Sequence, residues 1–541
     1  MTKEFDVFTN KFAQDIFLQK YSFDKQEDWS QTCRRVVNAV CGQYLDNEKK
    51  EKIYNLMLDR KFIPGGRYLY ASGRPFHQVN NCFLFRAEDS REGWSDIMHK
   101  ITMSLMTGGG IGVDYSNIRG EGEPIKGTGG TCTGPIALME MVNEAGRHIM
   151  QGGARRSAIW AGLNWKHSDV LKFLKLKDWS SELRLLKEKD LNFRLPMEGT
   201  NISVIYDTEF YVAYNDRKHP LYKHAREVWK LNCNQAFKTA EPGMSFNFLK
   251  DGDSLRNACT EVTSEDDSDK CNLGTMWMNR FDNKEEFAEG CKLATEFLIC
   301  GGIYSDTPTE KIKEVGTKNN RIGLGLGGIH EWLMVRGYKY QVTPELHKWL
   351  NIYEQESDAA AYITAKELGV AIPKGKRAIA PTGTIGILAE TTTGIEPLFC
   401  KAYKRRYLDG KDWKYQYVVD GTVKRLLDKG VAIEDIQDSY DISFKERVKF
   451  QADVQNYVDM SISSTCNLPA WGSELNNETN IDKNSKILLK YGKRLRGFTC
   501  YPDGARGGQP LTRVSLKEAL ENEGKVFEEN MTECVGGVCG V

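Results

Sequence analysis

The stretch NACTEVTSEDDSDKC, residues 257–271, places an amide, a thiol and a carboxylate at alternate positions: Asn257, Cys259 and Glu261. Alternate side chains of an extended segment or finger loop point the same way, so all three could face one cavity. A neighbouring carboxylate raises the pKa of a thiol, which makes Glu261 a poor partner for a thiolate. The trio suits a thiol that works as a radical, with the carboxylate as base for a substrate hydroxyl and the amide orienting it. On spacing alone, a solvated loop beside a buried cysteine stays open as an alternative.

A pair of thiols, Cys534 and Cys539, lies in the C-terminal stretch ECVGGVCGV, with four residues between them, two of which are glycine. Two thiols on a flexible end suit exchange with a buried disulfide and with an external reductant. The alternative is half of a zinc site, which needs further ligands at similar spacing, and no second cysteine pair of that kind occurs. The pattern favours a redox role and no metal site.

Two other motifs have the composition of ligand-binding turns. APTGTIG, residues 380–386, is expected to end a strand and open a helix, where backbone amides and the Thr382 and Thr384 hydroxyls would hold a phosphate; a capped turn is the alternative. GLGLGG, residues 323–328, matches G-x-G-x-x-G, but a second strand ending in an acid is missing. A strand packed where no side chain fits is therefore favoured there over a dinucleotide site.

The pattern along the chain predicts an α/β core. Residues 1–60 have helical spacing, and residues 105–135 are glycine-dense, which favours ordered loops. From about residue 200 to 400, short apolar strands alternate with helical stretches. The expected strands are 201–207, 244–248, 321–328 and 377–383, and the expected helices are 285–303, 328–338 and 357–370.

Charge and composition exclude several classes of protein. Lys plus Arg equals Asp plus Glu, 74 against 74, which gives no electrostatic case for nucleic acid or an anionic membrane as partner. No apolar run reaches the ~18 residues of a membrane span, and the N-terminus has no signal core, so a cytoplasmic location is expected. Fourteen cysteines in that setting are expected to be mostly buried thiols, with a few reactive ones.

Taken together, these pieces resemble the ribonucleotide reductase large subunit over about 450 residues. NACTE resembles the Asn-x-Cys-x-Glu finger loop of that family, which implies that Cys259 carries the thiyl radical, Glu261 is the base and Asn257 is the orienting amide. NNCF and KCNLGT resemble the segments that hold the reducing thiols, so Cys82 and Cys271 would form the disulfide that supplies two electrons. ECVGGVCG resembles the tail that re-reduces it. The resemblance then implies a shuttle role for Cys534 and Cys539 and a thioredoxin- or glutaredoxin-like partner.

Other segments resemble the substrate and effector loops of the same family. APTGTIGILAETTTGIEP resembles the substrate-phosphate turn, and FIPGGRYLYASG another substrate-lining segment. LMTGGGIGV, KGTGGTCTGP and QGGARRSA resemble the loops around the allosteric specificity site. The implied substrate-binding residues are Asn81, Pro381, Thr382, Gly383, Thr384 and Ile385. The residues implied to hold a deoxynucleoside triphosphate effector are Asp89, Ser90, Arg119, Gly153, Arg155 and Arg156.

Within the family, the resemblance points to the adenosylcobalamin-dependent class. The chain contains no Tyr-Tyr pair, GFTCYPDGARGGQP resembles the cobalamin class, and Cys271 follows Cys259 by only twelve residues. No Arg-Gly-Tyr-like segment of a glycyl-radical enzyme is present near the C-terminus. The alternatives are a large subunit that needs a separate metal radical subunit, a non-catalytic nucleotide-binding redox sensor, and a dehydrogenase that uses residues 323–328.

The resemblance also implies an architecture. The expected fold is a ten-stranded α/β barrel of two antiparallel five-stranded halves, with the finger loop inside. Residues 1–60 would be a helical region without an ATP cone, 61–510 the barrel with effector loops around 85–160, and 511–541 a flexible redox tail. The chain lacks the insertion by which monomeric members imitate a dimer interface, so a homodimer is expected.

Overall fold

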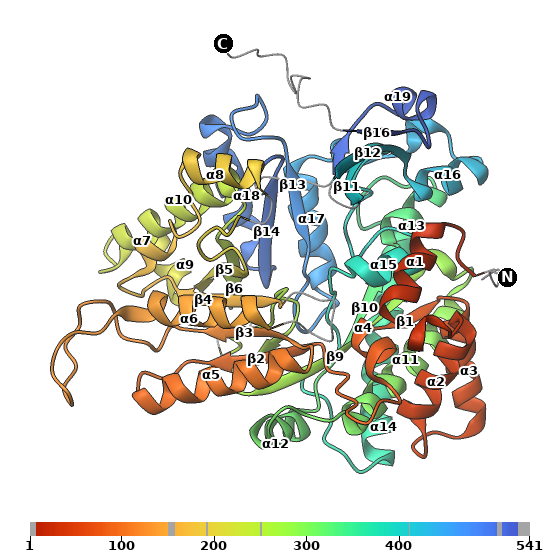
Figure 1. Cartoon of the computed structure of the whole chain (residues 1–541), viewed down its shortest axis with the longest axis horizontal. Coiled ribbons are helices and arrows are strands. Elements are labelled where there is room, and N and C mark those ends of the chain that lie inside the picture. The colour runs from red at the N-terminus through yellow and green to blue at the C-terminus, as the bar shows by residue number, and fades with distance from the viewer. Residues whose placement is uncertain are drawn as a thin grey trace.

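The structure of the chain, a computed structural model, describes residues 7–149, 157–190, 193–248, 252–409, 412–505 and 511–528 (Figure 1). A sheet of ten strands runs through the centre and is surrounded by helices. This mixed arrangement confirms the predicted α/β class. No helix in the described ranges is long and apolar enough to cross a membrane.

Two runs of parallel strands make up the large sheet. The first run has five strands: β2 (Cys82–Arg86), β3 (Gly110–Asp114), β4 (Ile159–Asn164), β5 (Thr200–Tyr206) and β6 (Gly243–Phe246). The second run consists of the parallel pairs β9 (Asp269–Trp277) with β10 (Ile322–Gly327) and β13 (Thr465–Leu468) with β14 (Gly497–Pro502). The runs meet in antiparallel fashion, β9 beside β2 and β14 beside β6, and β1 (Phe62–Pro64) lies antiparallel to β9.

The segment 377–383, expected to be a strand, forms two isolated bridges instead. Arg377 bridges Leu324 of β10, and Ile379 bridges Ile462, just before β13. The amides of Lys376 and Arg377 donate to the Asp459 carboxylate at 3.0 and 2.8 Å. The Ala378 and Ile379 amides donate to the carbonyls of Leu324 and Ser461, and the pairing ends there because Pro381 has no amide hydrogen and Thr382 has a φ of +49°.

Helices cover the sheet and build the N-terminal region. Residues 7–60 contain α1 (Lys11–Lys20), α2 (Trp29–Cys41) and α3 (Asn47–Leu58), each with an N-cap side chain that accepts a bond from a first-turn amide. The remaining helices are α4 (Gly66–Ala71), α5 (Arg91–Met106), α6 (Gly134–His148), α7 (Val170–Phe173), α8 (Ser181–Lys189), α9 (Thr208–Asn215), α10 (Tyr222–Thr239), α11 (Lys284–Tyr304), α12 (Glu310–Asn319), α13 (Ile329–Val335), α14 (Pro344–Glu367), α15 (Gly383–Ala389), α16 (Gly421–Asp428), α17 (Phe444–Gln455), α18 (Glu478–Gly492) and α19 (Leu516–Glu521).

A second, smaller sheet includes part of the C-terminal segment. Its order is β15 (Leu511–Arg513), β11 (Ala402–Asp409), β12 (Asp412–Val419) and β16 (Val526–Glu528). Residues 511–528 of the expected tail therefore form two strands and α19. The shuttle cysteines, Cys534 and Cys539, lie outside the described residues.

Glycines in β3 and β10 allow other parts of the chain to approach closely. Strand β3 lies within the glycine-dense stretch that was expected to be loop. At Gly112 of this strand, a Cβ would lie 1.8 Å from the carbonyl oxygen of Arg256. In β10, a Cβ at Gly323 would lie 2.3 Å from the Leu273 side chain, and one at Gly325 would lie 2.8 Å from the Ala378 carbonyl oxygen. This confirms the interpretation of GLGLGG as a strand packed where no side chain fits.

Candidate active site

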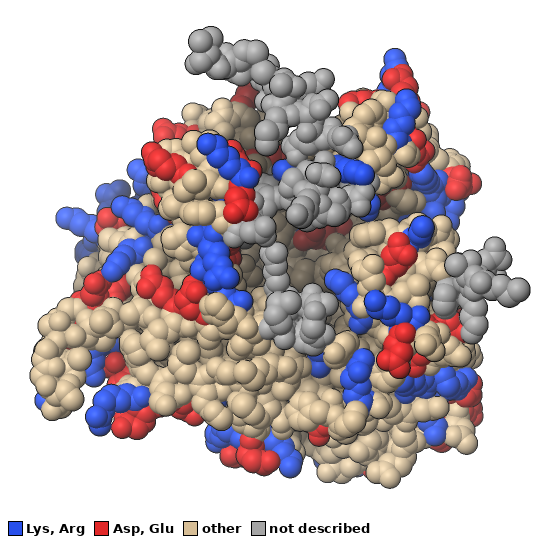
Figure 2. All heavy atoms as spheres, viewed as in Figure 1, with Lys and Arg blue, Asp and Glu red and all other residues tan. Residues whose placement is uncertain are grey.

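One cavity brings together most of the residues that the sequence selected. Four of the five predicted catalytic residues line it: Cys82, Asn257, Cys259 and Glu261. All six predicted substrate-binding residues line it as well: Asn81, Pro381, Thr382, Gly383, Thr384 and Ile385. Figure 2 shows the surface hollowed near the middle of the molecule, between β14 and α15 of Figure 1.

The amide, thiol and carboxylate converge through a turn. They lie between the short antiparallel strands β7 (Leu255–Arg256) and β8 (Thr263–Ser264). The Thr260 amide donates to the Asn257 carbonyl at 3.1 Å, and Thr260 has a φ of +71°. Strand alternation, the expected reason for their common direction, is therefore not what aligns them. The side chain of Asn257 closes the turn by accepting from the Val262 amide at 3.0 Å.

Asn257 and Glu261 both contact the thiol of Cys82. The Asn257 amide nitrogen donates to Cys82 Sγ at 2.9 Å, and Glu261 Oε1 lies 4.0 Å from the same sulfur. Glu261 is 2% exposed, and burial raises its pKa to about 7. Its Oε2 atom has no hydrogen-bond partner among the described residues. A carboxylate with these properties can take or return a proton near neutral pH.

Cys82 and Cys271 are partners across the sheet. They face each other in the antiparallel register of β2 and β9, although 189 positions separate them in the sequence. Directly opposite residues of an antiparallel pair have Cα atoms about 4.5–5.5 Å apart, within the range that a disulfide spans. Burial raises the pKa of both thiols, and the Glu261 carboxylate raises that of Cys82 further. Cys271 is fully buried and lies outside the cavity lining, behind Cys82.

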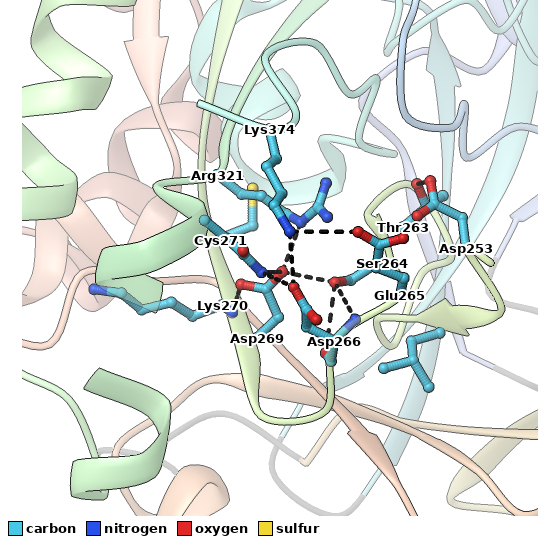
Figure 3. Close-up of polar contacts among 12 residues, drawn as sticks. Asp253, Thr263, Ser264, Glu265, Asp266, Asp269, Lys270, Cys271, Arg321 and Lys374 are labelled. Carbon is cyan, nitrogen blue, oxygen red and sulfur yellow. Dashed lines mark hydrogen bonds and ion pairs between the residues drawn. The ribbon is translucent and has the colours of Figure 1, made fainter. Parts of the chain in front are cut away.

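A buried polar network fixes the strand that carries Cys271 (Figure 3). The carboxylate of Asp269, two residues earlier, accepts from Arg321 Nε at 2.6 Å and from the Ser264 hydroxyl at 2.7 Å. The side chains of Asp269 and Arg321 are 0% and 1% exposed. A buried, hydrogen-bonded ion pair of this kind holds its backbone segment in one position.

The turn before α15 presents polar groups to the opposite side of the cavity. Thr382 adopts a φ of +49°, is 6% exposed, and has an Oγ1 atom without a hydrogen-bond partner among the described residues. Asn81 Oδ1 likewise has none within the described part of the chain. Buried polar atoms are costly when unbonded, so these atoms indicate a polar ligand at this site.

Sequence reasoning missed the residue that anchors the Cys259 turn. Arg256 is fully buried, and its guanidinium donates to the carbonyls of Leu255 and Phe246 at 3.0 and 3.2 Å and to Asn247 Oδ1 at 2.6 Å. Burial lowers its pKa to about 9. No spacing rule selects this arginine, because its acceptors are mostly backbone carbonyls, which every residue carries.

A second cavity also reaches Cys259. Residues of β4, β5 and β14 line it, among them Trp160, Asn201, Ser203 and Thr499. The indole nitrogen of Trp160 donates to the Ser203 hydroxyl at 2.9 Å. The thiol of Cys259 thus lies between two cavities that have largely different walls.

A third cavity, of about 570 Å³, contains three of the predicted effector residues: Asp89, Ser90 and Arg119. Arg119 Nε donates to Asp89 Oδ2 at 2.7 Å, and the Ser90 hydroxyl caps α5 by accepting from the Gly93 amide at 2.9 Å. The volume is in the range of small-molecule sites. The other three, Gly153, Arg155 and Arg156, lie outside the described residues.

Comparison with known proteins agrees with this geometry. A family model described as "Ribonucleotide reductase, barrel domain" matches residues 80–362 and 376–501. A vitamin B12-dependent ribonucleoside-diphosphate reductase of Thermoplasma acidophilum is 26% identical over 94% of this chain and 71% of its own length. One of the same name from Mycobacterium tuberculosis is 25% identical over 93% of this chain and 79% of its own. A ribonucleoside-diphosphate reductase large chain of Cryptosporidium parvum is 27% identical over 67% of this chain and 51% of its own. Because the family model covers well over half of the sequence, the chain belongs to the ribonucleotide reductase family.

Proposed function

We propose that this chain reduces ribonucleotides to 2′-deoxyribonucleotides by thiyl-radical chemistry, with adenosylcobalamin as the source of the radical. The observation that carries the proposal is the convergence of Cys82, Cys259 and Glu261 on one cavity, with Cys271 directly beside Cys82. The names of the B12-dependent relatives support the choice of cofactor.

The reaction divides among these side chains. The Cys259 thiyl takes the 3′ hydrogen of the ribose, and the Glu261 carboxylate takes the proton of the 3′ hydroxyl. The 2′ hydroxyl leaves as water after protonation by the Cys82–Cys271 pair. That pair supplies two electrons and becomes a disulfide, and Cys259 returns its hydrogen to the 3′ carbon. Overall, one ribonucleotide and two thiols give one deoxyribonucleotide, one disulfide and water.

The residues around the second cavity fit the adenosyl part of the cofactor. Asn201, Ser203 and Thr499 offer neutral hydrogen-bonding groups beside the Trp160 ring, which suits an uncharged nucleoside. Adenosylcobalamin, when bound, supplies an organic radical that oxidises the Cys259 thiol. The protein's contribution is to place that thiol at the boundary of the two cavities and to exclude water from it.

We assign the substrate phosphates to the turn 381–385. The Oγ1 atom of Thr382 needs a bonding partner, and phosphate oxygens accept from hydroxyls and from backbone amides. The ribose then lies toward Cys82 and Glu261, and Asn81 is available to a sugar hydroxyl.

We infer that the ten strands close into a barrel and that residues 257–262 are its inner finger loop. The bridges of Arg377 and Ile379 support closure, because they link β10 to the segment that precedes β13. The close approach of Arg256 to Gly112 supports a position of this loop against the inner face of β3.

We place a deoxynucleoside triphosphate effector in the cavity of Asp89, Ser90 and Arg119 and expect the chain to act as a homodimer through α5 and α6. Met103, Met106 and Met141 on these helices are 37%, 60% and 48% exposed. The surface over α6 carries few charged side chains in Figure 2. Exposed apolar side chains on adjacent helices are typical of an interface.

We expect Cys534 and Cys539 to re-reduce the Cys82–Cys271 disulfide and to be reduced in turn by a thioredoxin- or glutaredoxin-like protein. The purified chain should convert ribonucleotide to deoxyribonucleotide when adenosylcobalamin and a dithiol are added. Activity that requires a second, metal-containing protein would instead support the metal-subunit class. Effector binding without any product would support the redox sensor.

A further inference from the structure

The N-terminal region contributes a side chain to the candidate active site. Tyr21, at the C-terminal end of α1, lines the same cavity as Cys82, Glu261 and the turn 381–385. The side chain is well buried, with 8% of the residue exposed. The family match begins at residue 80, so Tyr21 comes from a segment that precedes it.

The hydroxyl of Tyr21 lies directly over Gly66. A Cβ at Gly66 would lie 2.8 Å from Tyr21 Oη and 3.2 Å from its Cε1 atom, so only glycine leaves room for the ring. Gly65, the preceding residue, is equally close to Asn81, since a Cβ there would lie 2.5 Å from Asn81 Oδ1. Asn81, Gly65, Gly66 and Tyr21 therefore follow Cys82 as neighbours along one wall of the cavity.

Several contacts hold the backbone around Tyr21. Its amide donates to the Phe17 carbonyl at 2.9 Å, and Arg35 Nη2 contacts its carbonyl at 3.4 Å. Arg35 also donates to the Leu69 carbonyl of α4 at 3.2 Å and is paired with Glu27 at 2.8 Å. The backbone of Tyr21 is thereby tied to α4 through Arg35.

The same N-terminal segment is attached to α15, the helix that follows the turn 381–385. Helix α1 packs against α15. Glu390, at the end of α15, accepts from the Thr9 amide at 2.8 Å and from the Asn10 amide at 3.0 Å, and its Oε2 accepts from Arg60 at 2.7 Å. Glu390 is 8% exposed, so this ion pair is screened little by solvent. Tyr21 and the turn therefore belong to one rigidly connected wall.

We propose that the Tyr21 hydroxyl donates a hydrogen bond to a phosphate oxygen of the bound nucleotide. This inference rests on the proposed function, because the turn 381–385 marks the phosphate end of the cavity only if the substrate is a ribonucleotide. The packing of α1 against α15 brings Tyr21, at the end of α1, to the side of the cavity that the turn lines. A phenol is a neutral donor, and its bond to a charged oxygen is stronger than a bond to a neutral acceptor.

The test compares Tyr21→Phe, which removes only the hydroxyl, with Tyr54→Phe. Tyr54 is on α3 of the same region, outside the cavity lining, and its hydroxyl lies 2.7 Å from the Ser30 hydroxyl. Affinities of a ribonucleoside diphosphate and of the matching ribonucleoside are measured for the full chain by calorimetry, together with Tm. Thr382→Val serves as a separate check on the phosphate turn.

We expect Tyr21→Phe to weaken nucleotide binding about tenfold or more and to leave nucleoside binding unchanged, because a bond to a charged group is lost; the Tm measurement verifies that the variant is folded. Tyr54→Phe should match wild type for both ligands. Nucleotide affinity within twofold of wild type in Tyr21→Phe, or an equal loss for nucleotide and nucleoside, would overturn the inference. If Thr382→Val still weakens the nucleotide selectively, the proposed function survives; a wild-type chain that binds no ribonucleotide would refute both.

Discussion

Gly112→Ala tests whether the position of the Cys259 turn depends on an empty space in β3. The added Cβ would lie 1.8 Å from the Arg256 carbonyl oxygen, 2.7 Å from its carbonyl carbon and 3.1 Å from Asn257 Cα. Ordinary van der Waals contact requires a displacement of about 1.5 Å. The atoms in the way are backbone, so no side-chain rotation relieves the contact.

The displacement must reach the reacting groups. Arg256 is buried and its guanidinium is bonded to several carbonyls, which ties the start of the turn to its surroundings. We therefore expect a shift of the Arg256 backbone to move residues 257–262 together. A misplacement of about 1 Å costs about 10²-fold in rate. We therefore expect kcat for deoxyribonucleotide formation to fall at least about 100-fold in Gly112→Ala.

The assay is deoxyribonucleotide formation by the cofactor-loaded chain, with circular dichroism and Tm to verify the fold. Gly421→Ala is the matched control, because a Cβ at Gly421 meets only an ordinary contact of 3.6 Å with Arg425. A folded Gly112→Ala enzyme with kcat within threefold of wild type would refute the reasoning.

Three further predictions concern the proton, the tail and the interface. Burial raises the pKa of Glu261 from 4.5 to about 7, so kcat/KM should rise with pH through about 7 as the carboxylate forms, and Glu261→Gln should abolish turnover; a flat pH profile between 5.5 and 8 would contradict this role. The native state holds this proton more tightly than the unfolded chain, so the free energy of unfolding should decrease as the pH rises from 4.5 to 7 in wild type. The decrease should be smaller in Glu261→Gln, and urea unfolding at several pH values would measure both. Cys534→Ser should retain single turnover but lose multiple turnover with thioredoxin, and full multiple turnover would refute the tail assignment. Met106→Asp should convert a dimer to a monomer in light scattering, whereas Leu475→Asp, at another exposed apolar site, should not; a dimeric Met106→Asp would place the interface elsewhere.

The sequence predicted which residues share the cavity better than it predicted the reason for their geometry. Alternate spacing suggested that Asn257, Cys259 and Glu261 face one cavity, and they do, but a turn with a positive φ at Thr260 aligns them. The pairing of Cys82 with Cys271 came from resemblance alone. Register between β2 and β9 puts the two residues opposite each other, and register depends on contacts that spacing within either segment cannot specify.

The supporting residues were out of reach for a different reason. Tyr21 and the Asp269–Arg321 pair act through partners that are distant in the sequence, and Arg256 acts through backbone carbonyls, so their residue types look ordinary where they occur. The segment 377–383 had the composition of a strand, but its pairing is cut short because Pro381 has no amide hydrogen and Thr382 has a positive φ. By contrast, glycines at alternate positions of residues 323–327 correctly indicated a tightly packed strand, because each omits a side chain that has no room.

The most direct test of the account is a single-turnover experiment without external reductant. Tail-disabled chain, Cys534→Ser with Cys539→Ser, is mixed with adenosylcobalamin, effector and ribonucleotide, and both the deoxyribonucleotide and the alkylatable thiols are counted by mass spectrometry. The account predicts up to one deoxyribonucleotide per chain and an equal amount of the Cys82–Cys271 disulfide. A chain that also carries the Cys259→Ser substitution should form no product. Product formed while Cys82 and Cys271 remain thiols, or product from the Cys259→Ser chain, would contradict it.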